Sequence, residues 1–115
     1  MNKIEECLNE IPQETKLIIA ALDNPIRQAI LVLLSKRGQL TFSDFQKELD
    51  IDKLKLNFHL KKLFSSALID HYYKHELGNQ KYSFYSITSL GRRVLTNLNS
   101  AIIPPPPVRE QQATN

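Results

Sequence analysis

The spacing of apolar residues changes at Leu68, and this change limits the fold more than any other feature of the sequence. Before that point, apolar residues recur at three- and four-residue steps, which is typical of amphipathic helices. Two runs rich in tyrosine, phenylalanine and isoleucine then follow, separated by the turn dipeptide Gly78-Asn79. Helical spacing returns after residue 88. The sequence therefore predicts a mainly α-helical fold with one small β-hairpin over residues 69–88.

Three helices are expected before residue 40. The first is short and ends at Pro12, because proline cannot continue a helix, and a second follows over about residues 13–22. The third has Asn24 as its N-cap, Pro25 at its first position and Gly38 just beyond its end. Its apolar residues cover more than one side, which predicts a central core helix. They are Ile26, Ala29, Ile30, Leu31, Val32, Leu33 and Leu34.

A helix-turn-helix pattern precedes the hairpin. Thr41 and Asp44 have the spacing of a capping box at the start of a short helix, which carries Phe42, Phe45 and Leu49. Asp52 is the expected N-cap of the next helix, residues 53–66. Two short helices around a tight turn are typical of a helix-turn-helix.

The hairpin returns into a last amphipathic helix that Thr88 caps. A helix-turn-helix followed directly by a hairpin is a winged helix, so residues 1–103 are expected to form one winged-helix domain. Residues 104–115 contain four consecutive prolines and a polar remainder with little apolar surface. This composition predicts a disordered, proline-rich tail.

Positive charge is concentrated in the second half of the chain. Residues 1–52 carry six basic and nine acidic side chains, whereas residues 53–93 carry eight basic and two acidic ones. Such a distribution is typical of a surface that binds a polyanion, although a merely solvated lysine-rich surface has the same composition.

The remaining composition narrows the classes of function. Cys7 is the only cysteine, which excludes an intramolecular disulfide and a cysteine-based zinc site and favours a reducing compartment. The longest apolar run, residues 17–22, is far below the roughly 20 residues that cross a bilayer. We find no paired carboxylates, activated nucleophile or glycine-rich phosphate loop. We therefore expect a soluble, cytoplasmic, non-enzymatic protein with no metal, cofactor or membrane partner.

The helix over residues 53–66 carries four lysines and no acidic residue. At about 100° per residue, one apolar stripe faces inward: Leu56, Leu60 and Leu63. A second set lies on the opposite side: Leu54, Phe58, Lys61 and Lys62. One interpretation is a DNA-recognition surface. The other is that the lysines are solvated and that Phe58 packs against a neighbouring helix.

The sequence resembles the arsenic-repressor (ArsR) type of winged helix-turn-helix transcriptional regulators. The resemblance covers roughly residues 22–95, and its more specific parts lie in the third helix, the recognition helix and the return from the wing. These parts are Asn24-Pro25 with Arg27 and Ile30-Leu31, then His59-Leu60-Lys61-Lys62-Leu63, then Tyr85, Ile87, Thr88 and Gly91.

The resemblance implies a homodimer whose N- and C-terminal helices pair and whose recognition helices enter major grooves. It also implies a repressor released by a ligand or metal. The sequence departs from the metal-sensing members, because "TFSDFQKEL" lacks their cysteines and residues 89–103 lack their aspartate and histidine. We therefore expect no metal sensing of these kinds, and the sequence indicates no effector.

The candidate DNA contacts lie on the recognition helix, at the start of the preceding helix and near the tip of the wing. Lysines neutralise phosphates, Asn57 suits an adenine edge, and Leu54 or Phe58 suits thymine methyl groups. The full set is Ser43, Lys53, Leu54, Lys55, Asn57, Phe58, Lys61, Lys62, Lys74, Asn79, Gln80 and Lys81.

The three histidines are interpreted differently. His59 leans inward, which favours a hydrogen bond between helices over a DNA contact. His71 and His75 are four residues apart on a strand, about 13 Å, which is too far for one metal ion. If the turn centres on Gly78-Asn79, Tyr72 and Tyr85 share one face of the hairpin, and Tyr73 and Phe84 share the other.

The terminal helices have apolar sides beyond what one core needs, which predicts a two-fold homodimer on a near-palindromic DNA operator. The predicted dimer residues are Ile4, Leu8, Ile11, Leu95, Leu98 and Ile102. The function that these features favour is a sequence-specific double-stranded DNA-binding regulator, expected to be a repressor. The alternative is a winged-helix module for protein contacts, in which Leu54 and Phe58 form a docking patch.

Overall fold

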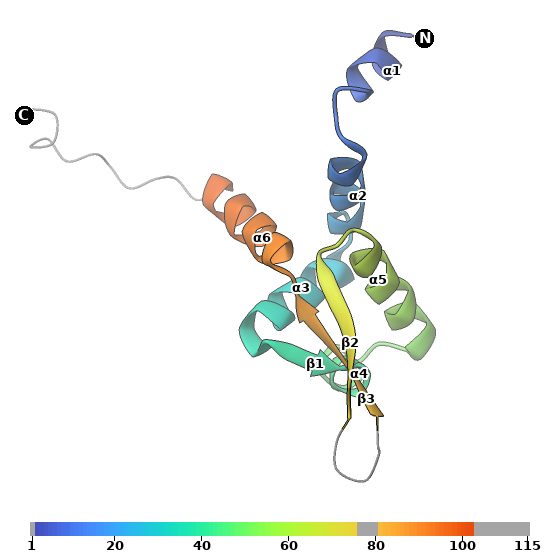
Figure 1. Ribbon diagram of the computed structural model, residues 1–115, viewed down its shortest axis with the longest axis vertical. Coiled ribbons are helices and arrows are strands. Elements are labelled where there is room, and N and C mark those ends of the chain that lie inside the picture. The colour runs from blue at the N-terminus through green and yellow to red at the C-terminus, as the bar shows by residue number, and fades with distance from the viewer. Residues whose placement is uncertain (1, 76–80, 103–115) are drawn as a thin grey trace, which may run out of the picture.

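The computed structural model of the protein describes residues 2–75 and 81–102. In these residues, helices and strands follow the order predicted from the sequence, with one additional strand before the helix-turn-helix (Figure 1). The elements are α1 (Lys3–Leu8), α2 (Gln13–Leu22), α3 (Pro25–Arg37), β1 (Gln39–Thr41), α4 (Phe42–Leu49), α5 (Lys53–Ser65), β2 (Ile69–His75), β3 (Lys81–Ile87) and α6 (Ser89–Ile102). The mainly α-helical winged-helix fold is confirmed.

The central helix α3 begins and ends as its sequence predicts. The Asn24 side chain accepts hydrogen bonds from the backbone N–H groups of Ile26 and Arg27, at 2.8 and 3.2 Å. Gly38 ends the helix with φ of 90°, a conformation that glycine adopts without strain. The buried side differs from the predicted one, because Ala29 and Val32 are exposed. The buried residues are Arg27, Ile30, Leu31 and Leu34.

The helix-turn-helix consists of α4 and α5. Thr41 and Asp44 form the predicted capping box at α4, with side chain to backbone distances of 3.1 and 2.9 Å. Asp50 follows α4 in the left-handed conformation, which turns the chain sharply before α5 begins. Phe45 of α4 is fully buried in the core. The local signals of the sequence therefore predict this unit correctly.

The sheet contains a third strand that the sequence analysis missed. In the order β1-β3-β2, β1 pairs antiparallel with β3, and Leu40 lies opposite Tyr85. Tyr85 meets Phe45 edge to face, with 5.9 Å between ring centroids. The short β1 therefore connects the base of the wing to the helix-turn-helix.

The predicted faces of the hairpin are wrong. Tyr72 lies opposite Phe84 and Tyr73 opposite Ser83, one residue away from the expected pairing. The Tyr72 and Phe84 rings stack at 5.9 Å, and His71 stacks on Tyr85 at 4.3 Å. A shift of one residue in register moves every side chain to the other face of a hairpin. The predicted turn, Gly78-Asn79, lies outside the described residues.

The last helix is attached firmly at its first turn. Thr88 Oγ1 accepts a hydrogen bond from the backbone N–H of Gly91 and itself lies 2.7 Å from the carbonyl oxygen of Ala67. A Cβ atom on Gly91 would lie 2.3 Å from the Leu68 carbonyl oxygen, so glycine allows this close approach. Val94, one turn further along, still packs against the core, and the rest of α6 projects from the body of the domain (Figure 1).

The first helix projects from the body at a different place and buries none of its residues (Figure 1). It ends at Leu8, not at Pro12. The backbone N–H groups of Glu10 and Ile11 donate to the carbonyl oxygens three residues earlier, Cys7 and Leu8, which is the tighter pattern typical of a helix end. Most of the predicted dimer residues are exposed: Ile4, Leu8, Ile11, Leu98 and Ile102. Leu95 is half-buried.

Within the described residues, no single helix is long and apolar enough to cross a membrane. The pair α2 and α3 meets that criterion only when taken together, and the two helices are bent by 96° at their junction. The predicted tail, residues 104–115, lies outside the described part of the chain.

Candidate nucleic-acid interface

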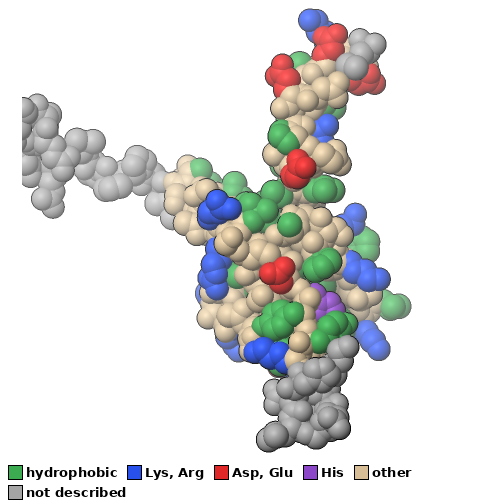
Figure 2. Space-filling model, viewed as in Figure 1, with side chains coloured by type: hydrophobic (Ala, Val, Ile, Leu, Met, Phe, Trp, Pro, Cys, Tyr) green, Lys and Arg blue, Asp and Glu red, His purple; other side chains and the backbone are tan. Residues whose placement is uncertain are grey.

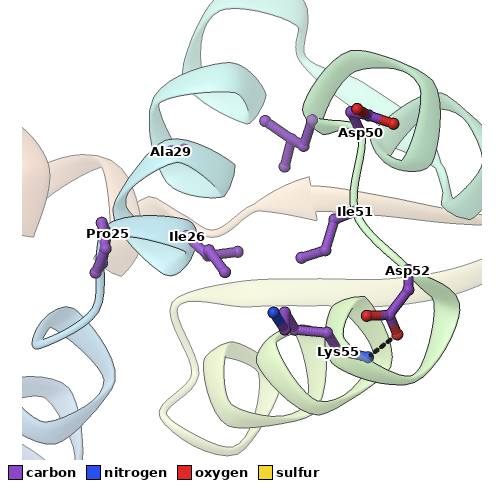
Figure 3. A pocket seen from close by; sticks show the side chains of 8 residues that line it. Pro25, Ile26, Ala29, Asp50, Ile51, Asp52 and Lys55 are labelled. Carbon is purple, nitrogen blue, oxygen red and sulfur yellow. Dashed lines mark hydrogen bonds between the residues drawn. The ribbon is translucent and has the colours of Figure 1, made fainter.

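Helix α5 is held at its N-terminus by the turn that precedes it. Asp52 is the N-cap and its carboxylate accepts a hydrogen bond from the backbone N–H of Lys55 at 3.0 Å (Figure 3). A carboxylate at this position also interacts favourably with the helix dipole. The cap and the left-handed Asp50 together set the direction of α5 relative to α4.

The two sides of α5 differ sharply in exposure. Leu56, Leu60 and Leu63 are buried in the core, as predicted. On the opposite side, Leu54 is 82% exposed and Phe58 is 53% exposed. The four lysines of the helix are also exposed, and Asn57 is half-buried at the edge. The outer side of α5 is therefore accessible to a binding partner, as the sequence predicts.

His59 links α5 to α3 and α2 through a buried arginine. The Arg27 guanidinium lies 2.9 Å from His59 Nδ1 and also donates to the carbonyl oxygens of Ala21 and Ala20, at 2.6 and 3.2 Å. Because arginine has only donors, Nδ1 must accept and His59 must be neutral. Burial, the nearby Arg27 charge and the Lys55 charge all lower the pKa of His59. The prediction of an interhelical histidine is confirmed, and we call this set of contacts the Arg27 latch.

Phe58 combines the two interpretations that the sequence left open. Half of its surface is exposed, yet the ring also lines a cleft of about 330 Å³ between α5 and α2. Lys62 Nζ lies 5.6 Å from the centroid of the Phe58 ring, which places the cation over the aromatic face. Phe58 is therefore available to a partner from both the outer side of α5 and this cleft.

Lys55 lies on the flank of α5 that faces α3. It lines a cavity of about 420 Å³ between α3 and the turn that joins α4 to α5. Figure 3 shows Ile26 and Ile51 pointing toward one another across this cavity, with the Lys55 side chain reaching toward them from α5. Of the predicted lysine contacts, Lys55 is thus the one beside this cavity.

The other flank of α5 faces the wing. Asn57, Lys61 and Phe64 line a cleft of about 260 Å³ together with His71 and Tyr85. The Nε2 atom of His71 is buried and has no hydrogen-bond partner among the described residues. Burial raises the pKa of the Tyr85 hydroxyl, with a smaller contribution from Tyr73. Hydrogen-bonding groups from α5 and from the wing therefore meet in one cleft.

The remaining predicted contacts have different surroundings. Ser43 is exposed at the start of α4 and lines a hollow with Tyr82 and Ser83 of the wing. Lys74 Nζ lies 3.4 Å from Gln39 Oε1 and 5.2 Å from the centroid of the Phe84 ring. Asn79, Gln80 and the Lys81 side chain lie outside the described residues.

The sequence did not predict the roles of two residues that support the interface, Arg27 and His71. In the sequence, Arg27 stands out only through the family resemblance. Its spacing from the buried Leu31 and Leu34 is the signal that indicates a buried hydrogen-bonding role. His71 was interpreted only as a residue of the wing. Its position beside Asn57 depends on the packing of the wing against α5, which no local signal predicts.

Charge is distributed over the surface as the sequence indicates. Figure 2 shows acidic side chains gathered over the projecting N-terminal helix and basic side chains over the body of the domain, including the flank formed by α5. The only described ion pairs are Lys3 with Glu6 and Arg37 with Glu48. Within the described residues, the four lysines of α5 therefore have no acidic partner.

Solved structures of transcriptional regulators share this fold. A transcriptional regulator homologue from Pyrococcus horikoshii OT3 is 29% identical, with a TM-score of 0.60 over 79% of this chain and 95% of that one. An ArsR family transcriptional regulator is 25% identical, with a TM-score of 0.59 over 79% of this chain and 88% of that one.

A MarR family regulator from Enterococcus faecalis V583 has a TM-score of 0.65 at 17% identity, over 79% of this chain and 83% of that one, and shares the fold alone. No protein-family model and no curated protein matches the sequence. These three structural neighbours are transcriptional regulators and not enzymes. The resemblance to ArsR-type winged-helix proteins is confirmed, and MarR-type proteins share the same architecture.

Proposed function

We propose that this ArsR-like winged-helix protein is a sequence-specific, double-stranded DNA-binding transcriptional regulator that acts as a homodimer. The exposed outer side of α5 is the observation that carries the proposal, because it combines apolar and amide groups with lysines that form no ion pair with any described residue. In the proposed complex, α5 enters a major groove and the wing follows the backbone or an adjacent minor groove.

The chemistry of α5 separates into positioning and sequence reading. Lys53, Lys61 and Lys62 are exposed and suit backbone phosphates, which attract the protein to any sequence. Asn57 suits the N6 and N7 edge of adenine, and the exposed Leu54 suits a thymine methyl group. Phosphate contacts thus fix the register, and the other groups discriminate between bases.

The homodimer is supported by apolar surface that the described chain leaves uncovered. On α1 and α6, Ile4 is 72% exposed and Ile102 is 80% exposed. Burying such residues against a second copy is favourable by about 25 cal/mol per Å². A two-fold dimer would present two α5 helices about 34 Å apart, which matches one turn of duplex and requires a near-palindromic operator. Repression is the expected direction of regulation by resemblance.

Selection of bound duplexes from a random pool, repeated at a low and a high salt concentration, tests the proposal directly. We expect a near-palindromic consensus and a steep loss of affinity with salt, because phosphate contacts release counterions. Light scattering at micromolar concentration should give the mass of a dimer. Recovery of no enriched sequence at low salt would contradict specific binding, and a monomer would contradict the dimer.

A protein-docking module is the second candidate, favoured by the exposure of Leu54 and Phe58 on the same helix. Salt dependence separates the two candidates. A hydrophobic docking contact changes little with ionic strength, whereas DNA binding weakens steeply. Replacing Leu54 with Ser should abolish docking but should leave nonspecific DNA affinity nearly unchanged.

A further inference from the structure

The cleft between α2 and α5 has the composition of a small-molecule site. Its apolar side consists of Leu17, Ala20 and Ala21 from α2 and Phe58 from α5. Leu17 and Phe58 are 42% and 53% exposed, so each offers substantial apolar surface to an occupant. The volume of about 330 Å³ falls within the range of roughly 300–1,000 Å³ typical of ligand pockets.

The polar lining of this cleft carries charge of a single sign. The polar lining residues are Lys61, Lys62, Ser65 and Ser66. Two of them are cationic, and among the described residues no acidic side chain lines the cleft. The Ser66 hydroxyl already donates to the Leu63 carbonyl oxygen at 2.9 Å, so the two ammonium groups and the exposed Ser65 are the available donors. By contrast, the cavity between α3 and the α4–α5 turn carries Asp50 and Asp52 beside Lys55.

We propose that the α2–α5 cleft binds an amphipathic organic anion, with its apolar body against Leu17 and Phe58 and its carboxylate or sulfonate at Lys61 and Lys62. Charge complementarity selects this class of ligand, because a cationic or purely apolar molecule would offer neither lysine an anionic partner, and no described acidic residue offers one either. Ligand pockets in proteins commonly combine an apolar lining with a few polar groups that orient the ligand.

The location of the cleft connects such a ligand to DNA binding. Lys61 and Lys62 are the same cations that the proposed function assigns to backbone phosphates, so one anion competes with the other. The carbonyl groups of Ala20 and Ala21 also accept the hydrogen bonds of the Arg27 latch, which joins α2 to His59 of α5. The ligand therefore antagonises DNA binding, and by thermodynamic linkage DNA weakens ligand binding by the same factor. This regulatory part rests on the proposed function, whereas the binding site does not.

Calorimetric titration of the full chain with decanoate tests the site without DNA. We expect decanoate to bind once per chain, and decyltrimethylammonium, a cation with the same aliphatic chain, not to bind. Replacing Lys62 with Ala should weaken decanoate about two- to five-fold, the range for loss of one partly exposed ion pair. Equal binding of the anion and the cation would overturn the assignment of the ligand class.

Two variants and a matched control locate the ligand. Ala20→Phe fills the cleft, and Leu17→Asn removes part of its apolar lining. Because both positions are exposed, the fold should tolerate both substitutions. Ala20→Phe should weaken decanoate by about tenfold or more, as expected when an occupant must displace an added ring. Ala29→Phe adds the same ring beside the α3 cavity and should change affinity less than about twofold. Unchanged affinity in both cleft variants would overturn the site.

Two further measurements distinguish this inference from the proposed function. If the wild-type protein binds no DNA but decanoate binding is lost in Ala20→Phe, the proposed function fails and the site remains. If decanoate binds in the cleft but leaves the affinity of an established operator unchanged, the antagonism is overturned. Conversion of a dimer to a monomer by Ala20→Phe, without decanoate binding to the wild type, would assign the cleft to a second copy of the chain and overturn the proposal.

Discussion

Both sides of α5 carry large apolar residues, but the two sides have opposite relations to the rest of the domain. The inner side buries three leucines and His59, all against neighbouring elements. The outer side exposes Leu54 and Phe58 among lysines, although these two residues are as apolar as the buried ones. Hydrophobicity alone therefore does not decide which side stabilises the fold. The direction of each side chain relative to α3 and the wing decides it.

This difference separates stability from recognition on a single helix. Changes on the inner side should lower the free energy of unfolding, because they create cavities or leave polar groups unpaired. Changes on the outer side should alter binding and leave the fold intact, since exposed positions contribute little to stability. A helix whose two sides failed to separate in this way would argue against α5 as a recognition helix.

The largest expected effect is on the inner side. Leu60→Ala should lower the free energy of unfolding by about 2–5 kcal/mol, because the site is 2% exposed and the surrounding core cannot fully collapse into the cavity. The matched control is Leu54→Ala, with the same chemical change at a position 82% exposed, which should cost less than about 0.5 kcal/mol. Denaturant unfolding of both variants measures this difference. Similar losses in the two variants would contradict the assignment of the sides.

The next effect is at the edge of the outer side, where Asn57 lies. Asn57→Ala should relax the preference for one base pair by about 1–3 kcal/mol, because a bidentate contact to adenine discriminates by that amount. Affinity for the preferred duplex should fall toward that for single-base variants, as measured by competition binding. An equal loss on every sequence would refute a base-reading role for Asn57.

The sequence predicted most of the inner side and of the fold, because the signals are local. The caps at Asn24, Thr41 and Asp52 each depend on residues within one turn, and all three are confirmed. The leucine stripe of α5 depends only on helical periodicity, which also predicted the exposure of its outer side.

The failures of prediction involve contacts between distant segments. Strand β1 is three residues long and exists through its pairing with β3, more than forty residues away. The faces of the hairpin were assigned one residue out of register, and a slip of that size has no local penalty in a sequence. Likewise, the Arg27 latch joins positions 32 residues apart, so only the packing of α3 against α5 reveals it.

A smaller effect is expected from the protonation of His59 on the inner side. Its pKa is lowered in the folded protein, mainly by burial, so the unfolded chain takes up the proton first as the pH falls. Stability from this group should therefore be complete above about pH 6.5 and should decrease on acidification, levelling once the folded His59 is itself protonated. Thermal unfolding at several pH values measures this decrease.

The matched variant for that measurement is His59→Gln, which keeps an acceptor for Arg27 but cannot be protonated. It should show a flatter decrease in stability between neutral and acidic pH than the wild type. If both proteins lose stability in parallel, the histidine in the Arg27 latch does not contribute to the pH dependence, and other groups must carry it.

The smallest expected effect is at Lys61 on the outer side. Lys61→Ala should reduce the slope of log affinity against log salt by about 0.9, the value for one phosphate contact, on every duplex tested. Between about 50 and 200 mM salt this amounts to roughly a three- to fourfold difference in affinity. Because Lys61 is exposed and forms no ion pair with any described residue, the free energy of unfolding should not change. A loss confined to one base sequence would instead place Lys61 among the base-reading groups, and the division between positioning and reading on α5 would have to be redrawn.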